Sequence, residues 1–169
     1  MITVWQSWGH VLLAAAFALP PAVLAVVVLA RWRAGSEGAV RRSVAEVGAV
    51  VGTLPWLWMV LTPRPGEPEL ALVPLRDLVD QLYGRPVAAT VQIAGNLLVL
   101  AAFGAFLPMR FAALSRPHRI AVAAAAVSLA IELLQYALRL GRVSSVDDVL
   151  LNTAGAVLSS LLTQRWRRT

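Results

Sequence analysis

The sequence contains no cysteine and no lysine, and only 14% of its 169 residues are charged. The absence of cysteine excludes disulfide bonds and thiolate metal sites. The shortage of charge accompanies a hydrophobic fraction of 59% and a mean hydropathy of +0.71, far above the value of a soluble protein. The composition therefore indicates an integral membrane protein, and the length predicts that residues 1–169 form a single membrane domain.

Sequence motifs of common enzyme classes are also missing. The chain has no Ser–His–Asp arrangement, no HExxH zinc motif, no phosphate-binding loop and no cluster of metal ligands. We therefore expect no cofactor. The net charge of +6 would favour nucleic acid in a soluble chain, but here every basic residue is an arginine and most of them flank apolar runs. This pattern is typical of membrane topology, so we expect membrane lipids as partners and no nucleic acid.

Five apolar segments are candidates for membrane-spanning helices, because a hydrocarbon core of ~30 Å needs about 20 helical residues. The fifth is the weakest, since its uninterrupted part covers only 149–162, and it could be a partial span. The first is followed by Arg31 and Arg33, so we interpret it as a retained span rather than a cleavable signal peptide. The expected fold is an all-α membrane bundle of about five transmembrane helices. The spans are expected at about 9–30, 44–62, 87–108, 120–138 and 146–162.

The fifteen arginines are divided unevenly between the loops that these five spans leave. The side that holds the C-terminus has two thirds of them, and cytoplasmic loops are enriched in arginine. We therefore expect the C-terminus in the cytoplasm and the N-terminus outside. The longest outer loop, 63–86, contains leucines at helical spacing between residues 74 and 83. This spacing predicts a short amphipathic helix, either lying on the outer membrane interface or packed on the protein.

Three of the apolar segments carry polar residues, although a charge in hydrocarbon costs roughly 3 kcal/mol or more. Residues three and four positions apart share one face of a helix, and the polar residues of each segment follow this spacing. Such stripes are expected to face one another and to avoid lipid. They predict a polar pocket in the outer half of the membrane. The stripes are Gln92 and Asn96; Ser128, Glu132, Gln135 and Arg139; and Asp148, Asn152, Gly155 and Ser159.

The same residues allow a structural and a functional interpretation. Asn96, Gln135 and Asn152, taken singly, fit interhelical hydrogen bonds. Glu132 and Asp148 are stronger functional candidates, because ionisable residues inside a membrane commonly mark a site. Asp147 lies on another face and is expected to cap the N-terminus of the last helix. The candidate ligand-binding residues are Asn96, Glu132, Gln135, Arg139, Arg142, Asp148 and Asn152.

Two smaller expectations concern contacts between the helices. Glu46 lies four residues after Arg42, which predicts an ion pair near the cytoplasmic end of the second span. Gly48, Gly52 and Gly104 are expected to let neighbouring helices approach closely.

The stretch from Glu132 to Gly155 resembles the most recognisable motif of the VanZ-like membrane protein family, which is named for a glycopeptide (teicoplanin) resistance protein. Asn96 with Gly104, and "ELALVPLRDL" around Pro74, resemble two further motifs, so the resemblance covers about 63–162. The Phe and Pro that are usual between the Asn and the Gly appear here as Leu100 and Ala102. The residues that match the main motif are Glu132, Gln135, Arg142, Asp148, Asn152, Thr153 and Gly155.

The resemblance implies a protein of the bacterial cell envelope, located in the cytoplasmic membrane. We expect a non-enzymatic role in which the outer pocket binds a lipid-linked cell-wall precursor, another cell-surface molecule or a glycopeptide antibiotic, and so lowers teicoplanin access. The alternative is a membrane enzyme that acts on a lipid-linked substrate with Glu132 and Asp148 as acid and base. A transporter or channel is a third hypothesis, which the confinement of the polar residues to the outer half disfavours.

Overall fold

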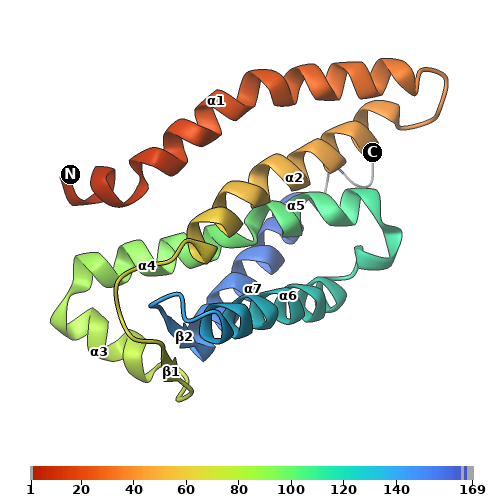
Figure 1. The fold of residues 1–169 in the computed structure, drawn as a ribbon. Coiled ribbons are helices and arrows are strands. Elements are labelled where there is room, and N and C mark those ends of the chain that lie inside the picture. Colours follow the sequence, from red (N-terminus) through yellow and green to blue (C-terminus); the bar gives the residue numbers. More distant parts are fainter. Residues whose placement is uncertain (1, 165, 167–169) are drawn as a thin grey trace.

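The structure, a computed structural model, describes residues 2–164 and 166, and it is almost entirely helical (Figure 1). The expected all-α class is confirmed. Arg165, Arg167 and Arg168, which enter the arginine count above, lie outside the described residues. The helices are α1 (Ile2–Trp32), α2 (Ala39–Leu61), α3 (Arg76–Gly84), α4 (Pro86–Val99), α5 (Ala101–Arg110), α6 (Pro117–Ala137) and α7 (Val146–Leu162). A 3-10 turn at Ala112–Leu114 and two strands, β1 (Glu69–Ala71) and β2 (Val143–Ser145), complete the list.

Each of the five expected segments is helical, but α1 and α2 begin earlier than expected, at Ile2 and Ala39, and the third expected segment is divided at Leu100 into α4 and α5. Within the described residues, three stretches are long and apolar enough to cross a membrane: α2, α4 joined to α5, and α6. The other two fall short of that length, because α7 has 17 residues and the apolar helix within α1 covers Ala16–Trp32. The structure therefore supports a helical membrane protein, while the count of about five spans is not confirmed.

The starts of three helices follow from local sequence. Pro86 and Pro117 occupy the first turns of α4 and α6, where the missing N–H of proline costs nothing. Ser145 caps α7, and its hydroxyl accepts the N–H of Asp147 at 3.1 Å. The expectation that Asp147 is the cap was wrong, because α7 begins at Val146, two residues before the start that a cap at Asp147 requires.

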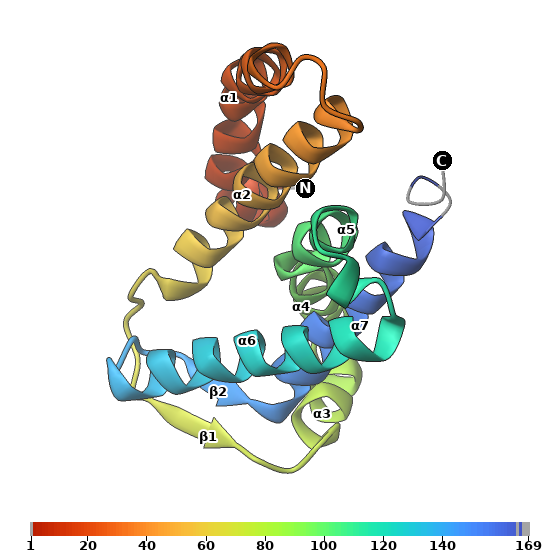
Figure 2. The same ribbon diagram turned by 90° about the vertical axis from the view of Figure 1, so that its right-hand side faces the viewer.

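Helix α7 runs between α6 and the α4–α5 pair (Figures 1 and 2). A Cβ on Gly155 would clash with the carbonyl oxygen of Leu97 on α4, and a Cβ on Gly104 would clash with that of Ala156 on α7. The expected role of Gly104 in close helix contact is confirmed. Gly48 and Gly52 likewise face α5 side chains closely, those of Phe106 and Ala102.

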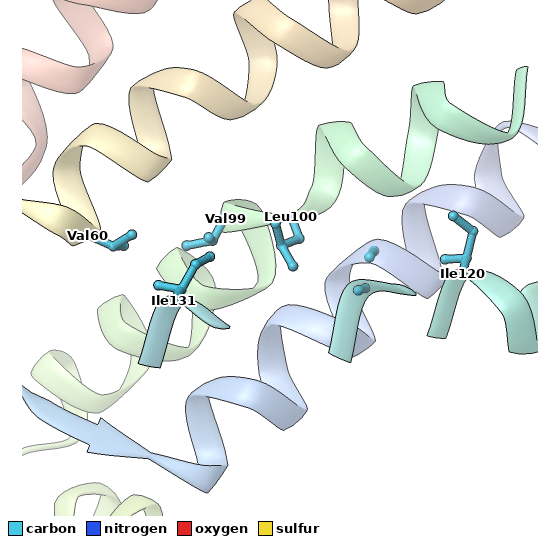
Figure 3. Packing of buried hydrophobic residues seen from close by; sticks show 7 residues of the cluster. Val60, Val99, Leu100, Ile120 and Ile131 are labelled. Carbon is cyan, nitrogen blue, oxygen red and sulfur yellow. The ribbon is translucent and has the colours of Figure 1, made fainter. Parts of the chain in front are cut away.

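An apolar core joins α2, α4, α5, α6 and α7 along the bundle. Figure 3 shows Val60 of α2, Val99 of α4 and Ile131 of α6 near one another beside Leu100, at the junction of α4 and α5, with Ile120 farther along α6. The labelled members are Val60, Val99, Leu100, Ile120 and Ile131. Because lipid is as apolar as these side chains, close packing rather than the hydrophobic effect holds such helices together.

Glu46 ties together the end of the bundle that holds the α1–α2 loop and the C-terminus of α5. Its carboxylate pairs with Arg33 at 2.8 Å and with Arg110 at 2.7 Å. The expected ion pair thus exists, but Arg42 was the wrong partner. The end of α1 and the end of α5 bring their arginines to Glu46, and neither contact can be inferred from helical spacing.

Candidate functional site

The two short strands lie at the opposite end of the bundle, together with α3 (Figure 2). They pair in parallel, with Glu69 opposite Val143 and Ala71 opposite Ser145. This pairing fastens the loop before α3 to the loop between α6 and α7. We call this part, formed by α3, β1, β2, the last turns of α2 and α6 and the first turns of α4 and α7, the strand end.

A cavity of about 580 Å³ opens at the strand end. This volume is in the range of small-molecule sites. Its walls come from α3, α4, α6, α7 and the loops that β1 and β2 belong to. Four uncharged polar side chains contribute, those of Gln81, Gln92, Gln135 and Ser145. The charged lining residues are Arg64, Glu69, Asp80, Arg142, Asp147 and Asp148.

Three of the predicted site residues line the cavity, namely Gln135, Arg142 and Asp148. The first two also bind the end of α2, whose last carbonyl groups have no partner within that helix. Gln135 Nε2 donates to the carbonyl of Val60 at 2.9 Å, and Arg142 Nη2 donates to that of Met59 at 2.7 Å. A cation at a helix C-terminus is also favoured by the helix dipole. Gln135 and Arg142 therefore have a structural role in addition to their place in the wall.

Asp148 is held in the wall by the polar stripe of α4. The side-chain amide of Asn96 donates to Asp148 Oδ1, and Gln92, one turn earlier, also faces this carboxylate. The stripes predicted on these two helices therefore meet. Asn96 itself lies behind Asp148 and does not line the cavity.

Glu132 and Asn152 are buried behind the cavity wall. Glu132 Oε2 accepts the backbone N–H of Ser145 at 3.0 Å, and the hydroxyl of Ser144 donates to the Glu132 carbonyl at 3.0 Å. Asn152 Nδ2 donates to Ser128 Oγ at 2.8 Å. These contacts join α6 to β2 and α7, so both residues position the site instead of lining it.

Arg139 is the one candidate residue that the structure places away from the others. Helix α6 ends at Ala137, and Arg139 adopts a left-handed conformation with φ 50°. Its side chain is exposed and does not line the cavity. The stripe on α6 therefore ends at Gln135.

Asp147 is a site residue that the sequence did not identify as such. It is 4% exposed, it lines the cavity, and its Oδ1 accepts the N–H of Leu75 at 2.5 Å. Leu75 precedes α3 with φ 64°, a conformation that is costly for a residue with a Cβ. Asp147 thus fixes the entry into α3, which brings Asp80 and Gln81 to the cavity.

Opposite charges face this cavity without pairing. Arg142 lies near both Glu132 and Asp148, yet the salt bridges found in the described part of the chain are those of Glu46 at the other end. Burial, together with the nearby Arg64 guanidinium, lowers the pKa of Arg142 to about 10, so Arg142 stays protonated at neutral pH. Among the described residues no group of three or more acidic or histidine side chains is arranged to hold a metal ion.

A family model described as VanZ/LLP1 matches residues 22–167. The chain belongs to the VanZ/LLP1 family. The match begins well before the stretch 63–162 that carries the resemblance, so it includes α2 and part of α1. No curated protein and no solved structure matches the chain.

Several motif residues of this VanZ/LLP1 chain lie at the strand end, whereas Asn96, Gly104 and Gly155 lie farther along the bundle. Arg142 and Asp148 line the cavity, Glu132 supports the wall, and Gly155 permits the close crossing of α7 and α4. Pro74 immediately precedes Leu75, so the loop motif provides the entry to α3. The three stretches that resemble the family thus build one structural unit.

Proposed function

We propose that this VanZ/LLP1 protein is a non-enzymatic component of the bacterial cell envelope whose cavity at the strand end binds the polar part of a lipid-linked or cell-surface molecule. By binding that molecule, or by binding the antibiotic itself, the protein lowers the access of glycopeptides such as teicoplanin to the cell surface. The observation that carries the proposal is the cavity, in which unpaired opposite charges surround a space large enough for a polar headgroup.

The proposal places the strand end outside the cell. Five spans, with α1 and α7 tilted or partly inserted, put the N-terminus outside and the C-terminus in the cytoplasm. The distribution of arginines supports this orientation, because the α1–α2 loop and the α5–α6 loop at the opposite end are rich in them. The cavity then opens at the outer surface of the cytoplasmic membrane.

The enzyme alternative has weaker support from the geometry. Glu132, which would have to exchange a proton with a substrate, is 6% exposed and its carboxylate faces the Ser145 N–H behind the wall. Proton transfer requires the carboxyl group to reach the reacting atoms directly or through one water. Transport is disfavoured by the apolar core around Val99, Leu100 and Ile131, which occupies the bundle below the cavity.

Binding of fluorescent teicoplanin to intact cells tests the proposed function. Cells that express the wild-type chain should bind less of it than cells that lack the chain. Asp148→Asn should restore binding, because it removes a cavity charge while its amide oxygen can still accept from Asn96. The matched control is Glu67→Gln, an exposed acidic residue outside the cavity lining. Equal binding by all cells at matched membrane levels would refute the glycopeptide role.

A further inference from the structure

The cavity at the strand end combines unpaired donors with unpaired acceptors. The Arg64 side chain has no hydrogen bond or ion pair with any described residue, although its backbone N–H donates to the Leu140 carbonyl. Arg142 uses only part of its guanidinium on the end of α2. On the acceptor side, Asp147 Oδ2 and Gln135 Oε1 are buried and have no partner among the described residues. Buried polar atoms without partners are uncommon, so each of these invites an explanation.

The arginine donors would bind an anionic ligand group, and the carboxylate and amide oxygens would bind a cationic one. Arg64 and Arg142 lie close enough to repel each other, and a phosphate diester between them would relieve that repulsion and accept the planar, forked donors that guanidinium offers. Asp147 and Asp148 are also mutually repelling neighbours. An ammonium group would neutralise them and donate to the free oxygens of Asp147 and Gln135.

The surroundings of the cavity indicate that the ligand is a lipid. The residues around it expose large apolar side chains, among them Leu72 at 67%, Leu75 at 54% and Val143 at 47%. The exposed Val79 and Leu82 of α3 continue this apolar rim. An amphipathic helix with its polar face on the cavity and its apolar face exposed is suited to the membrane interface. Lipid headgroups in that interface would have direct access to the charged lining.

From this arrangement we infer that the cavity binds a zwitterionic phospholipid headgroup, with the phosphate at Arg64 and Arg142 and a primary ammonium at Asp147, Asp148 and Gln135. Phosphatidylethanolamine has this chemistry. The inference rests on the proposed function, because it names the ligand class of the same cavity.

The test is titration calorimetry of the purified full-length protein in a phosphate-free detergent. The probes are dihexanoyl-phosphatidylethanolamine, dihexanoyl-phosphatidylglycerol, which lacks the ammonium, and glycerophosphoethanolamine, which lacks the acyl chains. We expect the ethanolamine lipid to bind at least about tenfold more tightly than the glycerol lipid, as the loss of a charge-assisted contact predicts. Equal affinity for the two lipids would overturn the inference. Tighter binding of the lipid than of the chain-free headgroup assigns the ligand to the membrane, and equal binding assigns it to a soluble headgroup.

Two variants test the binding of the phosphate and of the ammonium separately, and neither removes a contact that the fold needs. Arg64→Gln removes a side chain that has no partner in the described structure, and it should weaken both lipids by about tenfold. Asp147→Asn keeps an oxygen for the Leu75 N–H and should weaken only the ethanolamine lipid. The controls are Arg85→Gln and Glu67→Gln, which remove the same charges from exposed sites outside the lining. Wild-type affinity in both cavity variants would contradict the inference.

The outcomes distinguish this inference from the proposed function. If no ethanolamine probe binds but Asp148→Asn still restores teicoplanin binding to cells, the headgroup assignment fails and the envelope role stands. If the lipid binds selectively but teicoplanin binding is the same in all cells, the assignment stands and the glycopeptide role fails.

Discussion

Glu132 shows how one buried carboxylate can shape the cavity without facing it. Its side chain accepts the Ser145 N–H, and its backbone carbonyl accepts the Ser144 hydroxyl. These contacts fix the chain two and three residues before Asp147, so that Asp147 and Asp148 both enter the cavity wall from the first turn of α7. The account assigns Glu132 a positioning role.

Glu132→Ala should destabilise the protein, because the buried Ser145 N–H would lose its acceptor. The expected cost is about 1–3 kcal/mol, whereas Glu132→Gln retains an acceptor oxygen and should cost less. Unfolding of the purified variants by a denaturing detergent, followed by circular dichroism, measures both. A Glu132→Gln protein that is stable but has lost all function in the teicoplanin assay would instead favour the acid–base alternative.

Residue contacts within the stripes could be predicted, but contacts made through loops could not. Helical spacing predicted that the polar stripes face one another, because each helix has only one polar side to bury, and the contacts of Asn96 with Asp148 and of Asn152 with Ser128 agree with this. Arg64 and Asp147 lay outside this argument. The Arg64 N–H donates to the carbonyl of Leu140, and the Asp147 carboxylate accepts the N–H of Leu75. Both leucines lie in loops that are distant in sequence from the residues they contact.

At the scale of the elements, the short strand pair is the feature that the hydrophobic pattern did not reveal. β1 and β2 have three residues each and pair in parallel over a separation of more than 70 positions. Such short strands carry no periodic signal. The interruption between α4 and α5 at Leu100 was also unforeseen, because the residue there is neither glycine nor proline and is fully buried in the core. The helical character of the long apolar segments, in contrast, was predicted, because their apolar runs are continuous.

The crossing of α7 over α4 depends on Gly155. A Cβ at this position would clash with the carbonyl oxygen of Leu97, so Gly155→Ala should push the two helices apart at a cost of about 1–3 kcal/mol. Denaturing-detergent titration compares this variant with Gly84→Ala, at which an added Cβ meets nothing. Equal stability of both variants would show that the crossing is looser than described.

At the scale of the whole molecule, the two ends of the bundle differ in chemistry. One end is rich in arginines and is held together by Glu46, and the other contains the mixed-charge cavity, α3 and the strand pair. A membrane protein whose two ends differ so much in arginine content is expected to insert into the membrane in a single orientation. The orientation decides whether the cavity can meet a cell-surface molecule, so the proposed function depends on it.

The absence of cysteine allows the most direct test of the central claim, that the cavity opens outside the cell. Single cysteines are introduced as Asp80→Cys on the cavity and Glu37→Cys in the α1–α2 loop, both exposed positions. Intact cells are then treated with a membrane-impermeant maleimide. The account predicts labelling of Asp80→Cys in intact cells and of Glu37→Cys only after permeabilisation. The reverse pattern would place the cavity in the cytoplasm and contradict the account.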